Sequence, residues 1–216
     1  MLKEGREHKV NKSNVLYIHG FNSSPLSLKA EQTRLYLAEY FPETGFYCPQ
    51  LATSPNEAVA QLEEIIKQQS ESQWFIVGSS LGGYFASYLA EKYQCLAVLV
   101  NPAIKPYELL VDYIGEQVNP YTREVYQVTP DHMEQLQAIE QIKPTQFCQK
   151  KNNYLVMVQT ADEVLNYQQA VEKYQHCQLV VEAGGDHSFV NFDQQLPKIA
   201  QFFNLTDLRL TMQPQC

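Results

Sequence analysis

Short apolar runs alternate along this chain with longer segments in which apolar residues recur every three or four positions. The short runs are rich in β-branched and aromatic residues, as strands are, and the longer segments have the period of amphipathic helices. Because this alternation is typical of a parallel sheet with helices on both faces, the sequence predicts an α/β fold. We expect six strands, at residues 15–18, 46–48, 74–77, 95–100, 154–159 and 178–181.

Five helices are expected between and after these strands, at residues 28–40, 56–69, 81–93, 164–174 and 193–203. In the second of them Ala58, Leu62, Ile65 and Ile66 form one apolar stripe, which predicts a surface helix packed on the sheet. With 216 residues, 44% of them hydrophobic, the chain is long enough for one sizeable core and too short for two full catalytic domains. We therefore expect residues 1–216 to form a single domain.

The charge of the chain argues against polyanionic partners. It has 16 lysines and arginines against 24 aspartates and glutamates, a formal net charge of −8, which leaves no basic stripe for nucleic acid or an anionic membrane. The five cysteines are scattered with no C-x-x-C pair, so we expect reduced thiols and no metal site. The first residues are charged where a secretion signal is apolar, and no apolar run reaches about 18 residues, so we expect a cytoplasmic protein without stable membrane insertion.

The pentapeptide Gly78-Ser79-Ser80-Leu81-Gly82 is the strongest local signal in the chain. It lies between the strand expected at 74–77 and the helix expected at 81–93, and a G-x-S-x-G sequence at such a turn presents its central serine as a nucleophile. Small flanking residues are needed because the strand and the helix nearly touch. Ser80 is therefore the candidate nucleophile. The alternative, a glycine-rich turn that binds phosphate, lacks the lysine of a P-loop.

A serine hydroxyl needs a base that takes its proton, and the chain order that accompanies this kind of turn is serine, acid, histidine. His187 follows the last expected strand in a glycine-rich loop and is the candidate base, whereas His176 ends a helix, where a surface or capping role is expected. Asp162 is the first carboxylate after the preceding strand and is the candidate acid that orients the imidazole. Glu163 is the alternative acid, and Asp186 is disfavoured because it adjoins the histidine in sequence.

Two backbone N–H groups are expected to stabilise negative charge on a substrate carbonyl oxygen, in an oxyanion hole. One belongs to Leu81, the residue after the candidate nucleophile, and the other to Phe21, in the His-Gly turn after the first strand. His19 of that turn precedes the nucleophile in the chain, so we expect a structural role for it rather than a catalytic one.

Residues 102–153 interrupt the alternation with a connection far longer than the usual loop. A helix is expected to start near Thr129-Pro130, with proline at the first helical position. Connections this long are often lids or binding segments, so we expect a cap over the site; the alternative is an extra packed helix without substrate contact. The apolar and aromatic residues of this insertion include Tyr107, Leu109, Leu110, Tyr113 and Tyr121.

Three motifs carry a resemblance to a known family. They are His19-Gly20-Phe21-Asn22-Ser23-Ser24-Pro25, Gly78-Ser79-Ser80-Leu81-Gly82-Gly83-Tyr84 and Asn101-Pro102-Ala103. With further stretches at 106–110, 119–122 and 162–165, the chain resembles the YqiA/YcfP-like family of small bacterial esterases over nearly its whole length. The resemblance implies an α/β-hydrolase fold, the roles given above for the serine, aspartate and histidine, and no metal or cofactor.

The resemblance also implies a small-molecule substrate, a simple or activated acyl ester that is hydrolysed through an acyl-enzyme. Acyl-CoA thioesters are a second expectation, for which Lys105, Arg123 and Lys143 are candidate phosphate contacts, although scattered charges are usually only solvated. A serine peptidase is the alternative enzyme, and a non-catalytic ligand-binding module on the same scaffold is the alternative from another class. The presence of all three candidate side chains favours an enzyme.

Overall fold

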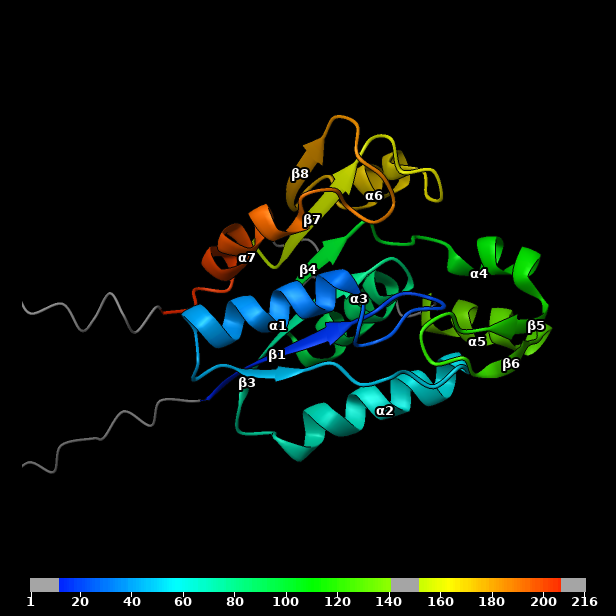
Figure 1. The fold of residues 1–216 in the computed structure, drawn as a ribbon, viewed down its shortest axis with the longest axis horizontal. Helices are drawn as coiled ribbons and strands as arrows, with labels where there is room; N and C mark the ends of the chain where they lie inside the picture. Colours follow the sequence, from blue (N-terminus) through cyan, green and yellow to red (C-terminus); the bar gives the residue numbers. More distant parts are fainter. Residues whose placement is uncertain (1–11, 141–151, 207–216) are drawn as a thin grey trace, which may run out of the picture.

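The computed structural model describes residues 12–140 and 152–206. Within them, six strands form one sheet in the order β2-β1-β3-β4-β7-β8, and every neighbouring pair is parallel (Figure 1). The strands are β1 (Ser13–Ile18), β2 (Gly45–Tyr47), β3 (Gln73–Ser79), β4 (Leu96–Val100), β7 (Tyr154–Gln159) and β8 (Gln178–Glu182). The sheet confirms the predicted fold class, and each strand overlaps the segment expected for it.

The order of the strands positions the site. From β1 the chain moves outward to β2 and then returns to β3, on the other side of β1. In open α/β sheets such a reversal leaves a crevice at the carboxyl ends of the two strands, where ligands bind. The loop after β1 begins at His19 and the turn after β3 holds Ser80, so both lie at this crevice.

Helices cover both faces of the sheet (Figure 1). One face carries α1 (Leu28–Tyr40) and α7 (Leu196–Phe202), whose buried side chains pack on β1, β3, β4 and β7. The opposite face carries α2 (Pro55–Gln68), α3 (Leu81–Tyr93) and α6 (Tyr167–Lys173). Two separate apolar cores result, and both are continuous with the central strands.

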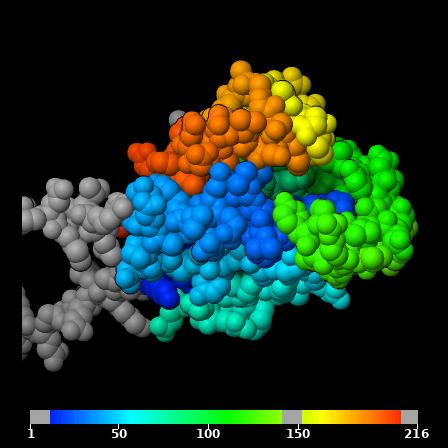
Figure 2. Space-filling model, in the orientation of Figure 1, coloured from blue at the N-terminus to red at the C-terminus, as the bar shows by residue number. Residues whose placement is uncertain are grey.

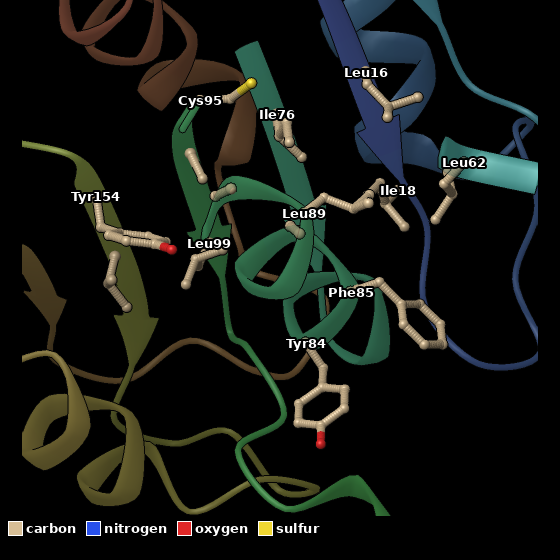
Figure 3. Close-up of a cluster of buried hydrophobic side chains, with 14 of the residues drawn as sticks. Leu16, Ile18, Leu62, Ile76, Tyr84, Phe85, Leu89, Cys95, Leu99 and Tyr154 are labelled. Atoms are coloured by element: carbon tan, nitrogen blue, oxygen red, sulfur yellow. The ribbon is translucent and has the colours of Figure 1, made fainter. Parts of the chain in front are cut away.

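The core beneath α2 and α3 is built from the apolar residues that recur along the strands and helices. Leu16 and Ile18 are two positions apart on β1, so both side chains point to that face. Leu62 of α2 and Leu89 of α3 pack with them in one cluster (Figure 3). All four side chains are fully buried. The apolar stripe predicted for the second helix is therefore its sheet-facing side.

Two C-terminal helices differ from the expected segments. Helix α6 begins at Tyr167 rather than at residue 164, because the Asp162 side chain accepts the N–H groups of Val164 and Leu165 and Asn166 caps the helix instead. The segment expected as one helix at 193–203 is divided into a 3₁₀ turn, η2 (Phe192–Gln195), and α7.

The insertion between β4 and β7 contains more structure than the one helix predicted. It comprises α4 (Pro106–Leu109), the 3₁₀ turn η1 (Leu110–Tyr113), an antiparallel hairpin of β5 (Gly115–Val118) and β6 (Val125–Val128), and α5 (Pro130–Glu140). Helix α5 starts at the expected proline. Residues 141–151 of the expected insertion lie outside the described residues.

Among the helices that the structure describes, none is both long and apolar enough to cross a membrane.

The buried face of α2 yields a stability prediction. Leu62→Ala removes a side chain with 0% exposure and should lower the free energy of unfolding by about 2–5 kcal/mol, because it leaves a cavity. The matched control is Leu35→Ala in α1, where the side chain is 56% exposed and a change within about 0.5 kcal/mol is expected. Urea unfolding measures both, and equal losses would contradict the packing described.

Candidate functional site

Ser80 lies at a strained turn between β3 and α3. Its φ of 56° and ψ of −123° are unusual for a residue with a side chain, so neighbouring groups must hold the turn. The Ser80 N–H donates to the Val100 carbonyl at 3.1 Å, and the Ser80 carbonyl accepts from the Ala103 N–H at 3.0 Å. The last residue of β4 and the segment after it therefore hold both backbone polar groups of the candidate nucleophile.

Glycines make this turn possible because the chain segments touch there. A Cβ at Gly78 would lie 2.3 Å from the Gly82 carbonyl oxygen, and a Cβ at Gly82 would lie 2.0 Å from that of Ile18. A Cβ at Gly20 would lie 3.1 Å from the Ser80 Cβ. The loop after β1 therefore passes directly beside the serine.

The structure brings the three predicted side chains into one hydrogen-bonded line. The His187 Nε2 lies 3.0 Å from the Ser80 Oγ. On the other side of the ring, Nδ1 lies 3.0 Å and 2.9 Å from the two carboxylate oxygens of Asp162. With Nδ1–H donating to the carboxylate, Nε2 is left as the acceptor for the serine hydroxyl.

Asp162 is held as a carboxylate. Its side chain is only 2% exposed, and burial by itself raises the pKa of a carboxyl group. The hydrogen bonds from His187 and from the N–H groups of Leu165 and Val164 outweigh burial and hold the pKa of Asp162 below its ordinary value. The negative charge beside the imidazole is therefore present at neutral pH.

The two alternative acids occupy other places. Glu163 accepts the backbone N–H of His187 at 2.9 Å, so it contacts the loop and not the ring. Asp186 donates its backbone N–H to the Gln159 side chain at 3.1 Å. Asp162 is the carboxylate that the structure brings to the imidazole.

Asn101 is a buried residue to which sequence reasoning assigned no role. It is 2% exposed, and its Nδ2 donates to the carbonyls of Asp186 and His187 at 3.0 Å and 3.2 Å. Its Oδ1 accepts the Gln159 N–H at 3.0 Å. One side chain thus ties the end of β4 to β7 and to the loop that carries the histidine. The sequence analysis singled out the Asn101-Pro102-Ala103 motif for the family resemblance but assigned no function to it.

Gln159 fastens the same loop from the end of β7. Its Oε1 accepts the N–H groups of Asp186 and Val190, and its Nε2 donates to the Val190 carbonyl and the Glu182 carboxylate. A Cβ at Gly185 would lie 1.9 Å from this Oε1, and Gly185 has a φ of +76°. Gly185 is therefore required by this close contact and by its positive φ.

Lys29 brings positive charge to the same loop. Its ammonium group donates to the Ser188 carbonyl at 2.8 Å, from helix α1. Burial lowers the pKa of Lys29 to about 8, although the carboxylates of Asp186 and Asp162 act in the opposite direction.

The N–H groups of Phe21 and Leu81 are available as a pair of donors. Within the described residues, neither donates to another protein group. Both residues line one cavity beside the serine turn. The positions predicted for an oxyanion hole therefore face a common space.

His19 has a structural position, as the sequence predicts. It is 4% exposed, its Nδ1 donates to the Gly20 carbonyl at 3.0 Å, and its Nε2 accepts the Leu51 N–H at 3.2 Å. This pattern uses the neutral ring, and burial lowers the pKa of His19, although backbone hydrogen bonds oppose the shift. The ring connects the loop after β1 to the loop after β2.

The insertion lies against the loop after β1 (Figure 2). The Tyr126 hydroxyl donates to the Asn22 Oδ1 at 2.7 Å, and the Asn119 Nδ2 donates to the Ser23 carbonyl at 2.9 Å. The Phe21 ring meets the ring of Tyr113 edge-on, at a centroid distance of 5.3 Å. The hairpin and this loop therefore form one wall of the cavity. The hairpin was not predicted from the sequence.

The side chains expected to serve the cap have different surroundings. Leu110 lines the cavity, whereas Leu109 and Tyr121 are exposed and the Tyr107 hydroxyl bonds to Glu140.

Among the candidate phosphate contacts, Lys105 pairs with Glu108 at 3.0 Å and Arg123 is exposed, while Lys143 lies outside the described residues. The described residues contain no group of three or more His, Cys, Asp or Glu side chains placed to hold a metal ion.

The burial of His19 predicts a pH effect on stability, because burial disfavours the charged ring and lowers its pKa. Unfolded His19 takes up a proton near its ordinary pKa of 6.5, whereas folded His19 resists it. Its contribution to stability is therefore complete above about pH 6.5 and is lost as the pH falls from there toward the folded pKa. NMR of the imidazole nitrogens should find the Nδ1–H tautomer and a midpoint below 6.5 for this residue.

The matched variants are His19→Gln and His176→Gln, the second at an exposed position. When the pH is lowered from 7 to 5, His19→Gln should lose less free energy of unfolding than His176→Gln, because only His176→Gln keeps the buried His19. Equal losses, or a His19 midpoint above 6.5, would contradict the described burial of a neutral ring.

Solved structures share this fold at low sequence identity. Est1E from Butyrivibrio proteoclasticus is similar with a TM-score of 0.66 and 14% identity, over 92% of this chain and 89% of the other. Mouse alpha/beta hydrolase domain-containing protein 10 gives 0.63 and 13%, over 88% and 89%. A monoacylglycerol lipase from Paleococcus ferrophilus gives 0.62 and 15%, over 89% and 95%. The fold is therefore that of the α/β hydrolases.

A sequence profile matches almost all of the described chain, over residues 14–204. Its description is uncharacterised protein family UPF0227. The match includes the loop after β1, the serine turn and the segments that carry Asp162 and His187. The chain therefore belongs to this family, the YqiA/YcfP-like family that its motifs resemble.

Proposed function

We propose that this protein is a serine hydrolase that cleaves small acyl esters through an acyl-enzyme on Ser80. The observation that carries the proposal is the line of hydrogen bonds from Asp162 through His187 to Ser80, with the N–H groups of Phe21 and Leu81 beside it. A nucleophile, a base, an orienting acid and two donors for an oxyanion are the groups that acyl transfer requires.

Acylation begins when the Ser80 oxygen attacks the ester carbonyl carbon and its proton passes to the His187 Nε2. The carbonyl oxygen becomes an oxyanion, which the N–H groups of Phe21 and Leu81 stabilise. The carbonyl then re-forms, the bond to the leaving-group oxygen breaks, and that oxygen takes the proton from Nε2. The free alcohol leaves, and the acyl group stays on Ser80.

Deacylation repeats these steps with water. A water molecule gives a proton to the His187 Nε2, and its oxygen bonds to the acyl carbon. The bond from that carbon to the Ser80 oxygen then breaks, the Ser80 oxygen takes the proton from Nε2, and the carboxylic acid leaves. Asp162 stays ionised throughout and stabilises the imidazolium that forms twice per cycle. Asn101 and Gln159 hold the loop that carries His187, so that its ring stays hydrogen-bonded between Ser80 and Asp162.

The alternatives have less support. Of the candidate phosphate contacts in the described chain, Lys105 is already paired with Glu108 and Arg123 is exposed, so thioester hydrolysis stays the secondary proposal. A peptidase needs room for an extended chain, whereas the insertion lies against the loop after β1. A non-catalytic binding module has no need for the aligned histidine and carboxylate.

Labelling with a fluorophosphonate tests the proposal without a choice of substrate. The reagent should attach to Ser80, as located by peptide mass spectrometry, because the hydrogen bond to His187 activates that hydroxyl. Ser80→Ala should abolish labelling. His187→Ala and Asp162→Asn should each reduce p-nitrophenyl acetate turnover by about 10³-fold or more.

The control is Ser79→Ala, beside the nucleophile but outside the hydrogen-bonded line, which should keep labelling at Ser80. Circular dichroism should find all the variants folded. A folded wild-type protein that neither takes the label nor cleaves the ester would overturn the proposal.

A further inference from the structure

We propose that Lys29 is a positioning residue for the hydrolysis, which holds the loop of His187 in place and offsets the negative charge of the carboxylates around it. Lys29 acts through His187 and lies outside the hydrogen-bonded line from Asp162 to Ser80. This inference rests on the proposed function. The loop in question, residues 183–191 between β8 and η2, is called the histidine loop below.

The contact of Lys29 with the histidine loop is direct. Lys29 lies in the first turn of α1 and is partly buried, and its Nζ donates to the Ser188 carbonyl at 2.8 Å. Ser188 follows His187 in the chain. A hydrogen bond from an ionised donor is roughly twice as strong as one between neutral groups. Lys29 therefore fixes the backbone directly after His187.

Lys29 reaches the histidine loop from a different element than the buried amides do. Asn101 and Gln159 hold the loop from the carboxyl ends of β4 and β7. Lys29 holds it from α1, the helix that follows the loop of Phe21. One side chain therefore joins the segment of an expected oxyanion donor to the segment of His187, and it limits the movement of one relative to the other.

The place of Lys29 in α1 is unfavourable unless negative charge lies nearby. The N-terminus of a helix carries a partial positive charge, which repels a lysine in the first turn. Two carboxylates face the ammonium group, Asp186 of the histidine loop and Asp162 after β7. Burial lowers the pKa of Lys29 to about 8, and both carboxylates oppose that shift. The ammonium form therefore predominates at neutral pH, beside the two acids.

Carboxylates around the histidine loop create the need for this positive charge. The Asp186 Oδ1 is buried and accepts no hydrogen bond within the described residues, and a buried charge of this kind is costly without an opposite charge nearby. Asp162 contacts the ring of His187, and Glu163 accepts its backbone N–H. Negative charge near an imidazole favours its protonated form, which cannot act as a base. Lys29 reduces that effect.

Replacement of Lys29 tests its role in the reaction. Lys29→Met removes the charge and the donor and should lower kcat for p-nitrophenyl acetate by about 10- to 100-fold, because a displaced His187 slows both acylation and deacylation. KM should stay within about threefold of the wild-type value, since both steps slow together. Lys29→Arg keeps the charge and a donor and should recover most of the loss. The control is Arg34→Met, farther along α1, where the guanidinium pairs with Glu31 at the surface and kcat should not change.

A pH profile separates the charge of Lys29 from its hydrogen bond. Lys29→Met should move the acidic side of the kcat/KM profile to higher pH by about half a unit at low salt, because a positive charge is lost near the imidazole. Asp186→Asn should move it to lower pH. The double variant keeps the wild-type net charge of the site, so its profile should return toward the wild-type position. Its kcat should stay low, because the Ser188 carbonyl still lacks its donor.

Melting temperatures show which variants are folded, and Asp186→Asn tests the charge effect even if Lys29→Met does not fold. An unchanged kcat in folded Lys29→Met, equal losses in Lys29→Met and Lys29→Arg, or a pH profile that neither Lys29→Met nor Asp186→Asn moves would overturn the role of Lys29. Each of these results leaves the serine hydrolase intact if the wild-type protein is labelled at Ser80 and cleaves the ester. A wild-type protein with neither label nor turnover would overturn both proposals.

Discussion

The close contact of β1, β3 and α3 at Ser80 is the constraint on which the rest of the site depends. Glycines at positions 78 and 82 let the backbones touch, and Gly20 brings the loop after β1 beside the serine. This contact forces Ser80 to a positive φ, and the end of β4 holds it there through backbone hydrogen bonds. The N–H groups of Phe21 and Leu81 and the Ser80 hydroxyl lie at the same crevice because of this contact.

His187 lies in the loop after β8, at the edge of the sheet, and reaches across to this crevice. Its loop therefore needs support of its own. Asn101 and Gln159 provide it at the carboxyl ends of β4 and β7, where both amides are buried and fully used in hydrogen bonds. Buried polar groups of this kind are costly when only partly satisfied, which favours a single arrangement of the loop. The sheet therefore sets the positions of both Ser80 and His187.

Much of this arrangement follows from local sequence. The bounds of α1 and α3 match the expected segments because apolar period and turn residues are local signals, and Ser80, Asp162 and His187 follow from motif and chain order. The β5–β6 hairpin was missed because its short strands are largely exposed and have no apolar run. Asn101 and Gln159 were missed because their partners are distant in sequence, as with the Asn101 bond to Asp186, 85 residues away. The start of α6 was wrong because side chains of Asp162 and Asn166 compete with the helix for backbone N–H groups.

The most direct test of this account is a crystal structure of the protein after reaction with a short alkyl fluorophosphonate. The phosphorus should be bonded to the Ser80 Oγ, with its oxygen about 2.7–3.1 Å from the backbone nitrogens of both Phe21 and Leu81. An adduct on another residue, or one whose oxygen points away from these two nitrogens, would contradict the account.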